Sequence, residues 1–251
     1  EKWFETISYS YSTMTSLFKG IAQAQNYAAC RPTYPAAVYD TIVSKIISTA
    51  CRSKTDMATT TTTTTTDPST RTLCIDIGCG TGQATTALAG LSSSLFFDRV
   101  IGVDPSDTQL QNAMPHPNVE YRHDSMEDAL SKMDDESALC ITSAQAAHWL
   151  DIPTFYEQAH RVLKPGGVVA IWCYGLNRFP NHPLVQERVD DLYENILGEY
   201  WDDRRRLVEN NYRDIPLIDT QFPEAFATGE RIEDNEMLHI QQEISGQQLV
   251  G

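Results

Sequence analysis

The segment whose residue types most clearly indicate chemistry is Asp76-Ile-Gly-Cys-Gly-Thr-Gly82, which follows a short apolar run. Glycine has no Cβ, so a backbone rich in glycine can approach a bound ligand closely. A carboxylate two residues before the first glycine attracts positive charge, directly or through a water molecule. The segment therefore predicts a ligand site at a turn between a strand and a helix, and it suits a ligand with an ammonium group.

Two classes of ligand bind at glycine turns of this kind: dinucleotides and S-adenosylmethionine. The dinucleotide pattern GxGxxG fails here, because its third glycine would be Gln83 if counted from Gly78 and Thr85 if counted from Gly80. Asp76 would also lie poorly beside a pyrophosphate, since both are negatively charged. The turn therefore favours S-adenosylmethionine.

Two further carboxylates follow predicted strands. Asp104 closes the second strand, where a carboxylate can accept both hydroxyls of a ribose. Asp124 follows the third strand and can accept from an adenine amino group, while the backbone N–H groups of Ser125 and Met126 could meet the ring nitrogens. The Met126 side chain could pack on the base. Each aspartate alone could equally be a helix cap, but their order, each at the end of a strand, favours a nucleoside site.

The elements that must position these residues are short apolar runs alternating with helical patterns. We expect strands at residues 73–77, 99–103, 119–122, 138–142 and 168–174, the last preceded by a turn over 164–167. Ser106, Ser125 and Asp151 are predicted to cap helices. This alternation predicts an α/β fold with a doubly wound, mainly parallel sheet. Beyond residue 175 an apolar helical stripe predicts a helical cap over the carboxyl edge of the sheet, where such folds bind ligands.

Composition excludes several classes of function. Acidic residues number 34 and basic residues 19, giving a net charge of −15, which argues against nucleic-acid binding and against a polybasic membrane tether. No apolar run approaches the roughly 20 residues of a membrane-spanning helix. The six cysteines form no CxxC pair, so we expect reduced thiols in a cytoplasmic protein and no metal site. The threonine run 59–66 is expected to be a surface loop.

From about Tyr27 to Tyr174 the chain resembles the class I S-adenosylmethionine-dependent methyltransferases. The resemblance lies in the strand order and in four motifs: DxGxGxG, Gly102-Val-Asp-Pro-Ser106, His123-Asp-Ser125 and Leu163-Lys-Pro-Gly-Gly167. Three further segments are similar to the trans-aconitate methyltransferase-like group: Tyr27–Pro35, Gln145-Ala-Ala-His-Trp149 and Tyr200-Trp-Asp202.

The resemblance implies S-adenosylmethionine as cofactor and a role for each matching residue. The methionine part would be held by Asp76, Gly78, Gly80 and Gly82, the ribose by Asp104, and the adenine by Asp124 and Ser125. Ser143 and Gln145 would line the methionine end, and Tyr27 and Arg31 would close over the cofactor, with Arg31 near its carboxylate. The expected parts are a lid segment over residues 1–35, a cofactor-binding core over 36–175, and a cap over 176–251. The family's closing antiparallel strand pair is not evident before residue 251, so truncation at the C-terminus stays an open alternative.

If the methyl group is accepted by a carboxylate, no general base is needed, whereas an amine or a phenol as methyl acceptor usually needs one. His148 is the candidate base, with a packing role beside Trp149 as the alternative. Tyr174 could face the acceptor or bond within the cap. Arg178 and Arg204 could bind a polycarboxylate beside Trp149, although the arginines of 204–206 could instead pair with nearby carboxylates.

We therefore expect a methyltransferase acting on a small molecule, with a carboxylic acid as the candidate acceptor. Two alternatives stay open: a regulatory or scaffolding protein that binds the cofactor without transferring a methyl group, and a nucleotide-dependent oxidoreductase. The sequence is silent on oligomeric state.

Overall fold

The computed structural model describes residues 33–55, 72–91, 97–226 and 229–232. The predictions made for Tyr27, Arg31, the threonine run and the residues after 232 lie outside this part of the chain.

The described core is built on a single parallel sheet, as the sequence predicts. Its strands are β1 (Leu73–Ile77), β2 (Arg99–Asp104), β3 (Val119–His123), β4 (Ala138–Ala144) and β5 (Leu163–Trp172). Their order in space is β3-β2-β1-β4-β5, and all four pairings are parallel. Strand order therefore reverses at β1, and in a doubly wound sheet the ligand crevice opens at this point, beyond the carboxyl ends of the strands.

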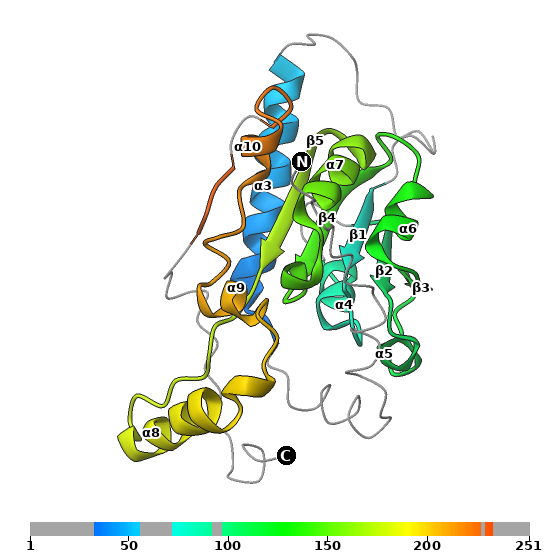
Figure 1. Cartoon of the computed structure of the whole chain (residues 1–251). Helices are drawn as coiled ribbons and strands as arrows, with labels where there is room; N and C mark the ends of the chain where they lie inside the picture. Colours follow the sequence, from blue (N-terminus) through cyan, green and yellow to red (C-terminus); the bar gives the residue numbers. More distant parts are fainter. Residues whose placement is uncertain (1–32, 56–71, 92–96, 227–228, 233–251) are drawn as a thin grey trace, which may run out of the picture.

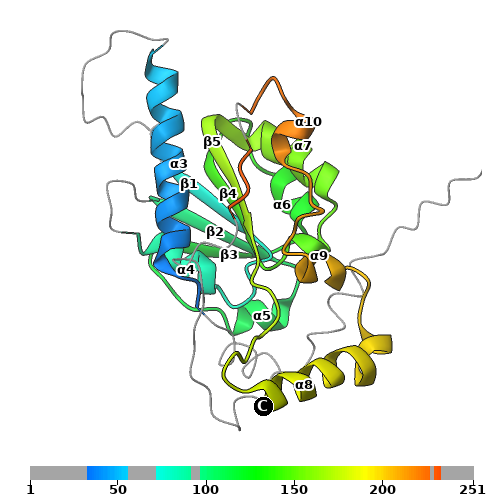
Figure 2. The same ribbon diagram turned by 90° about the vertical axis from the view of Figure 1, so that its left-hand side faces the viewer.

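Helices cover both faces of this sheet (Figures 1 and 2). One face is covered by α3 (Ala36–Thr55) and α4 (Gln83–Ala89), which bury Ile46 and Leu88 against β1, β2 and β4. The other face is covered by α6 (Met126–Ser131) and α7 (Ile152–Val162), which bury Leu130 and Phe155. Because alternate side chains of a strand point to opposite faces, Cys74 joins the first core and Ile75 the second.

The three predicted caps are confirmed. Ser106 accepts from the backbone N–H of Gln109 at the start of α5 (Asp107–Gln111), and Ser125 accepts from Asp128 at the start of α6. Asp151 accepts from Thr154 at the start of α7. Each cap satisfies a backbone N–H that has no partner within the helix, and each fixes where the chain turns after a strand.

The fifth strand differs from its prediction. It begins at Leu163, so the segment Lys164–Gly167 lies inside the strand and does not precede it. Ala138 pairs with Leu163 and Cys140 with Val168, so the extra residues of β5 form a bulge. Pro165 cannot donate to a sheet, and a bulge is where a strand tolerates proline, which is why the turn-like residues remain within β5.

Beyond β5 the chain leaves the sheet. An arm is formed by α8 (Pro183–Asp191), a π-helical turn η3 (Leu192–Ile196) and η4 (Gly198–Tyr200), and α8 lies apart from the sheet in Figure 1. The apolar stripe of this arm is largely exposed, with Leu184 76% and Ile196 57% accessible. The chain then returns through α9 (Arg205–Glu209), which contacts the short helix η2 (Ala147–Trp149), and α10 (Ile218–Gln221), which contacts α7. Of the described helices, none has the length and apolar character needed to cross a membrane.

Candidate active site

A cleft lies at the carboxyl ends of β1, β2 and β4. It is lined by the glycine turn, by the ends of these strands and by two aromatic residues, among them Asp76, Gly78, Gly80, Asp104, Gln145, Tyr34 and Trp149. Residues far apart in the sequence meet here because parallel strands end at the same edge of the sheet.

The glycine turn is shaped so that only glycine fits. Gly78, Gly80 and Gly82 have φ angles of +70°, +55° and +84°, in the left-handed region that disfavours other residues. A Cβ at Gly78 would lie 2.4 Å from the Cβ of Ala146, and one at Gly82 would lie 1.9 Å from the hydroxyl of Tyr121. The turn therefore exposes bare backbone to the cleft, as close binding of a nucleoside or amino acid requires.

Asp104 holds this turn against β2. One carboxylate oxygen accepts from the backbone N–H of Gly80 and the other from that of Ser106, each at 2.8 Å. Burial raises the pKa of Asp104, and these two bonds oppose the rise. Each oxygen has a second lone pair, so the carboxylate can still accept from a ribose hydroxyl.

Asp76 is completely buried beneath the turn. Its carboxylate accepts from the hydroxyls of Thr85 on α4, at 2.6 Å, and Thr142 on β4, at 2.7 Å. Burial raises its pKa to about 6, and these hydrogen bonds oppose the rise. Asp76 thus joins β1, α4 and β4 at the floor of the cleft. Its two threonine partners were not predicted, because no local pattern distinguishes them.

A second, smaller cavity adjoins the cleft. Its lining is mainly apolar and includes Pro105, Met126, Trp149 and Leu150, together with Asp124. Asp124 forms an ion pair with Lys132 at 2.6 Å, and the Ser125 hydroxyl is engaged as the cap of α6. Adenine is a flat base with an amino group that can donate to a carboxylate. Apolar side chains together with one carboxylate are therefore a lining that suits adenine.

Ser143, which lies within β4 and not after it as predicted, and Gln145, which follows β4, differ in their placement. Ser143 is completely buried and is not part of the cleft lining, and its hydroxyl has no hydrogen-bond partner among the described residues. Gln145 lines the cleft with φ +54°, and its side-chain oxygen accepts from the backbone N–H of Tyr174 at 2.8 Å. Gln145 thus ties the ends of β4 and β5 together.

Tyr34 lines the cleft but was not among the residues predicted for it. Its ring packs edge-on against Trp172, with centroids 5.5 Å apart, and lies 6.1 Å from the ring of Tyr174. The only signal in the sequence is the adjacent Pro35, which stiffens the chain just before α3.

His148 lies on η2 beside the cleft and does not line it. Its Nδ1 atom is 2.7 Å from the hydroxyl of Tyr212, and its ring lies 4.9 Å from that of Trp149. The imidazole therefore links η2 to the segment after α9, which is a packing arrangement like the alternative that the sequence left open.

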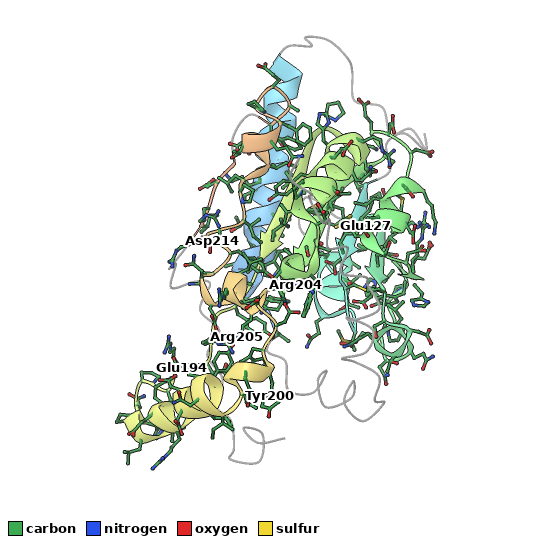
Figure 3. All side chains as sticks on the ribbon, in the orientation of Figure 1. Glu127, Glu194, Tyr200, Arg204, Arg205 and Asp214 are labelled. Carbon is green, nitrogen blue, oxygen red and sulfur yellow. The ribbon has the colours of Figure 1, made fainter. Side chains whose placement is uncertain are left out.

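The arginines are distributed between solvent and carboxylate partners. Arg178 is exposed. Arg204 pairs with Asp202 at 3.1 Å, Arg205 pairs with Glu209, and Arg206 lies 3.6 Å from Asp203. Arg204 alone of these also reaches the cleft wall, with its guanidinium carbon 4.8 Å from the centre of the Trp149 ring. Figure 3 places Arg204 at the edge of the sheet domain and Arg205 on the side of the arm.

A doubly wound parallel sheet whose first turn is a glycine cradle, followed by carboxylates at the ends of the next two strands, defines a Rossmann-like nucleoside-binding domain. No three His, Cys, Asp or Glu side chains cluster as a metal site within the described ranges. The absent third glycine of GxGxxG and the buried Asp76 distinguish this domain from dinucleotide-binding ones.

Comparison with known proteins identifies the particular kind of domain. A family model described as "Methyltransferase domain" matches residues 75–171. A Dictyostelium discoideum protein named as a methyltransferase is 37% identical over 197 residues, 76% of this chain and 63% of that one. A Saccharomyces cerevisiae protein named as an S-adenosylmethionine-dependent methyltransferase is 31% identical over 155 residues, 57% of this chain and 50% of that one.

A solved structure from Anaeromyxobacter dehalogenans, described as a type II methyltransferase, is 33% identical with a TM-score of 0.53, covering 74% of this chain and 66% of that one. Residues 75–171 therefore match a methyltransferase domain, and these relatives support the class I S-adenosylmethionine-dependent methyltransferase superfamily with S-adenosylmethionine as cofactor. The chain spans between half and two thirds of the length of the two curated relatives.

Proposed function

We propose that the protein transfers a methyl group from S-adenosylmethionine to a small molecule, with a carboxylic acid as the acceptor, as in the trans-aconitate methyltransferase-like group. The observation that carries the proposal is the glycine cradle, in which Gly78 and Gly80, both with φ in the left-handed region, line the cleft without a side chain. The chemistry of the lining fits the cofactor: carboxylates at strand ends and an adjoining apolar cavity.

In this proposal the residues of the cleft bind and orient. Gly78, Gly80 and Gly82 accommodate the methionine part above Asp76, and Asp104 accepts from the ribose. Asp124 and Met126, which line the second cavity, hold the adenine there together with the adjacent Ser125. The bound cofactor supplies a methyl group that is already activated on a sulfonium, so the protein contributes mainly alignment and exclusion of water.

The nature of the acceptor rests on a chemical argument. A carboxylic acid is ionised at neutral pH and needs no base, and the one candidate base, His148, is bonded to Tyr212 beside the cleft. Tyr174 would face the acceptor, and Arg204 and Trp149 are the nearest predicted acceptor residues to the cleft, while Arg178 is exposed. A single guanidinium at this edge is more consistent with a small acid than with several carboxylates.

The cofactor assignment is tested by calorimetric titration with S-adenosylhomocysteine and with NAD. We expect the first to bind and the second not to bind. Asp104→Ala and Gly80→Ala should each weaken binding tenfold or more, because the first removes a ribose acceptor and the second adds a Cβ at a cleft-lining position where it meets only Gln109. Gly198→Ala is the matched control, since a Cβ at Gly198 meets nothing within 4 Å. Binding of NAD alone, or equal binding by all variants, would contradict the assignment.

The acceptor is tested by a screen with cofactor labelled in its methyl group. Small carboxylic acids, amines and phenols are offered separately, and label is expected in the acid ester. Label in amines or phenols would overturn the acid but keep the enzyme class. No labelled product from a protein that binds S-adenosylhomocysteine would favour a binding protein without transferase activity.

A further inference from the structure

We propose that Arg204 is a positioning residue for the cofactor, acting through Trp149. The inference rests on the proposed function, because it adds to the acceptor role proposed for Arg204 a second role in holding the cofactor. The side chain would fix the indole of Trp149 in the place where that indole forms a wall shared by the cleft and the adenine cavity.

Trp149 is the residue on which cofactor positioning would depend, because it lines both cavities. It ends the three-residue helix η2, and its backbone N–H donates to Ala146 at 2.9 Å. Such a short helix has too few internal hydrogen bonds to fix a large side chain on its own. The orientation of the indole must therefore come from contacts outside η2.

Arg204, the residue before α9, supplies one such contact. Its guanidinium carbon lies 4.8 Å from the centre of the Trp149 ring, within the range of a cation–π contact. Asp202 aims the guanidinium, because its carboxylate accepts from the Arg204 backbone N–H at 2.9 Å and from Nε at 3.1 Å. These bonds also lower the pKa of Asp202, so the pair stays charged at neutral pH.

The neighbouring arginines show that this arrangement is specific to Arg204. Arg205, labelled in Figure 3, lies over the rings of Tyr193 on η3 and of Trp201, the residue after η4. Arg206 is exposed and lies near Asp203. Of the three consecutive arginines, therefore, one is stacked on the cleft wall, one on the arm, and one faces solvent.

The contact between Arg204 and Trp149 has a functional consequence for the segment that returns to the sheet through α9. A base in the adenine cavity would contact an indole that also packs against a guanidinium, so the segment that leads into α9 would contribute to cofactor affinity without touching the cofactor. Planarity matters, since a guanidinium can stack on an indole and an ammonium cannot. The support should be worth about a two- to fivefold change in affinity, as for an exposed cation–π contact.

The test is a double-mutant cycle on the dissociation constant of S-adenosylhomocysteine, measured by calorimetry. We expect Arg204→Gln to raise the constant about two- to fivefold, Arg204→Lys to have a smaller effect, and the control Arg206→Gln to have none. In a Trp149→Leu background, Arg204→Gln should cause no further change. A structural role alone would weaken binding equally in both backgrounds.

Two outcomes would overturn the inference while the wild type still binds: an Arg204→Gln variant that matches Arg206→Gln, or an effect that persists in the Trp149→Leu background. Failure of the wild type to bind would instead overturn the proposed function. If Arg204→Gln does not fold, Asp202→Asn tests the same contact, because it removes the group that aims the guanidinium. That variant should weaken binding in the presence of Trp149 only.

Discussion

At the scale of single residues, the site depends on carboxylates that are kept out of water. Asp76 and Asp104 both lie at strand ends with little or no exposed surface, and each is held by two hydrogen bonds. Hydroxyl and amide donors stabilise the charged form, but they only partly offset the loss of hydration. The protein therefore keeps charge in the cleft at a cost in folding stability, and that cost should be measurable at Asp76.

We predict that Asp76→Asn stabilises the folded protein at pH 7.5. The pKa of Asp76 is about 6 in the folded protein, against an ordinary value of 3.8 for an aspartate in an unfolded chain. Between these values the folded state holds a proton that the unfolded state has released, so the free energy of unfolding falls as pH rises from about 4 to about 6. The difference of roughly two pKa units corresponds to a cost of about 3 kcal/mol at neutral pH.

Urea unfolding of both proteins at several pH values checks this prediction. The advantage of Asp76→Asn should be largest above pH 7 and should vanish near pH 4. Asp203→Asn is the control, because Asp203 is almost fully exposed and should show no such dependence. A variant that is less stable than the wild type at pH 7.5 but not at pH 4 would show that the ionised carboxylate is stabilising.

The sequence predicts those site residues that can be recognised from their neighbours in the chain. The glycines and aspartates of the turn and of the strand ends could be recognised because each follows an apolar run. Thr142 could not, because its bond to Asp76 spans 66 residues and depends on the pairing of β1 with β4. Tyr34 was missed for the same reason: its contact with Trp172 depends on how α3 lies across β5.

At the scale of elements, boundaries set by a cap or a glycine were predictable. Helix α7 begins after Asp151, as expected, and α4 ends at Ala89, directly before Gly90. The bulge in β5 was not, since Lys164–Gly167 has the residues of a turn and only the partner strand reveals that pairing resumes around it. The arm was predicted as a helical cap over the carboxyl edge of the sheet; it is helical, but α8 lies apart from the sheet, and the spacing of apolar residues could not reveal that Leu184 and Ile196 would be exposed.

Helix η2 is the element whose placement depends most on a distant segment. We predict that Tyr212→Phe lowers the free energy of unfolding by about 1 kcal/mol, the typical value of a hydrogen bond, because it removes the contact with His148. Amide exchange at Ala147–Trp149 should become faster, since η2 would lose an anchor. Tyr200→Phe is the control, because Tyr200 is 77% exposed.

Unfolding in urea and hydrogen exchange read out this prediction separately. If Tyr212→Phe unfolds like the wild type and exchange at η2 is unchanged, the hydrogen bond contributes nothing to the position of the helix. His148 would then be free to act in another role, including that of a base.

At the scale of the whole molecule, the cleft results from topology and charge together. The sheet brings β1, β2 and β4 to one edge, while a net charge of −15 disfavours polyanionic partners and favours a cationic ligand. The elements around the cleft come from residues 34 to 149, so a ligand in it would contact several segments that are far apart in the sequence. Ligand binding should therefore stabilise the fold as a whole.

We predict that S-adenosylhomocysteine raises the melting temperature of the protein and that NAD does not. A ligand at one hundred times its dissociation constant adds about 2.7 kcal/mol to the stability of the folded state. For a chain of 251 residues, each kcal/mol corresponds to about 2–4 °C, so the expected rise is roughly 5–10 °C. Differential scanning calorimetry over a series of ligand concentrations measures it. Because the effect follows mass action, the rise must continue with the logarithm of concentration; a rise that stops at stoichiometric ligand, or an equal rise with NAD, would contradict a specific site for the sulfur-bearing nucleoside.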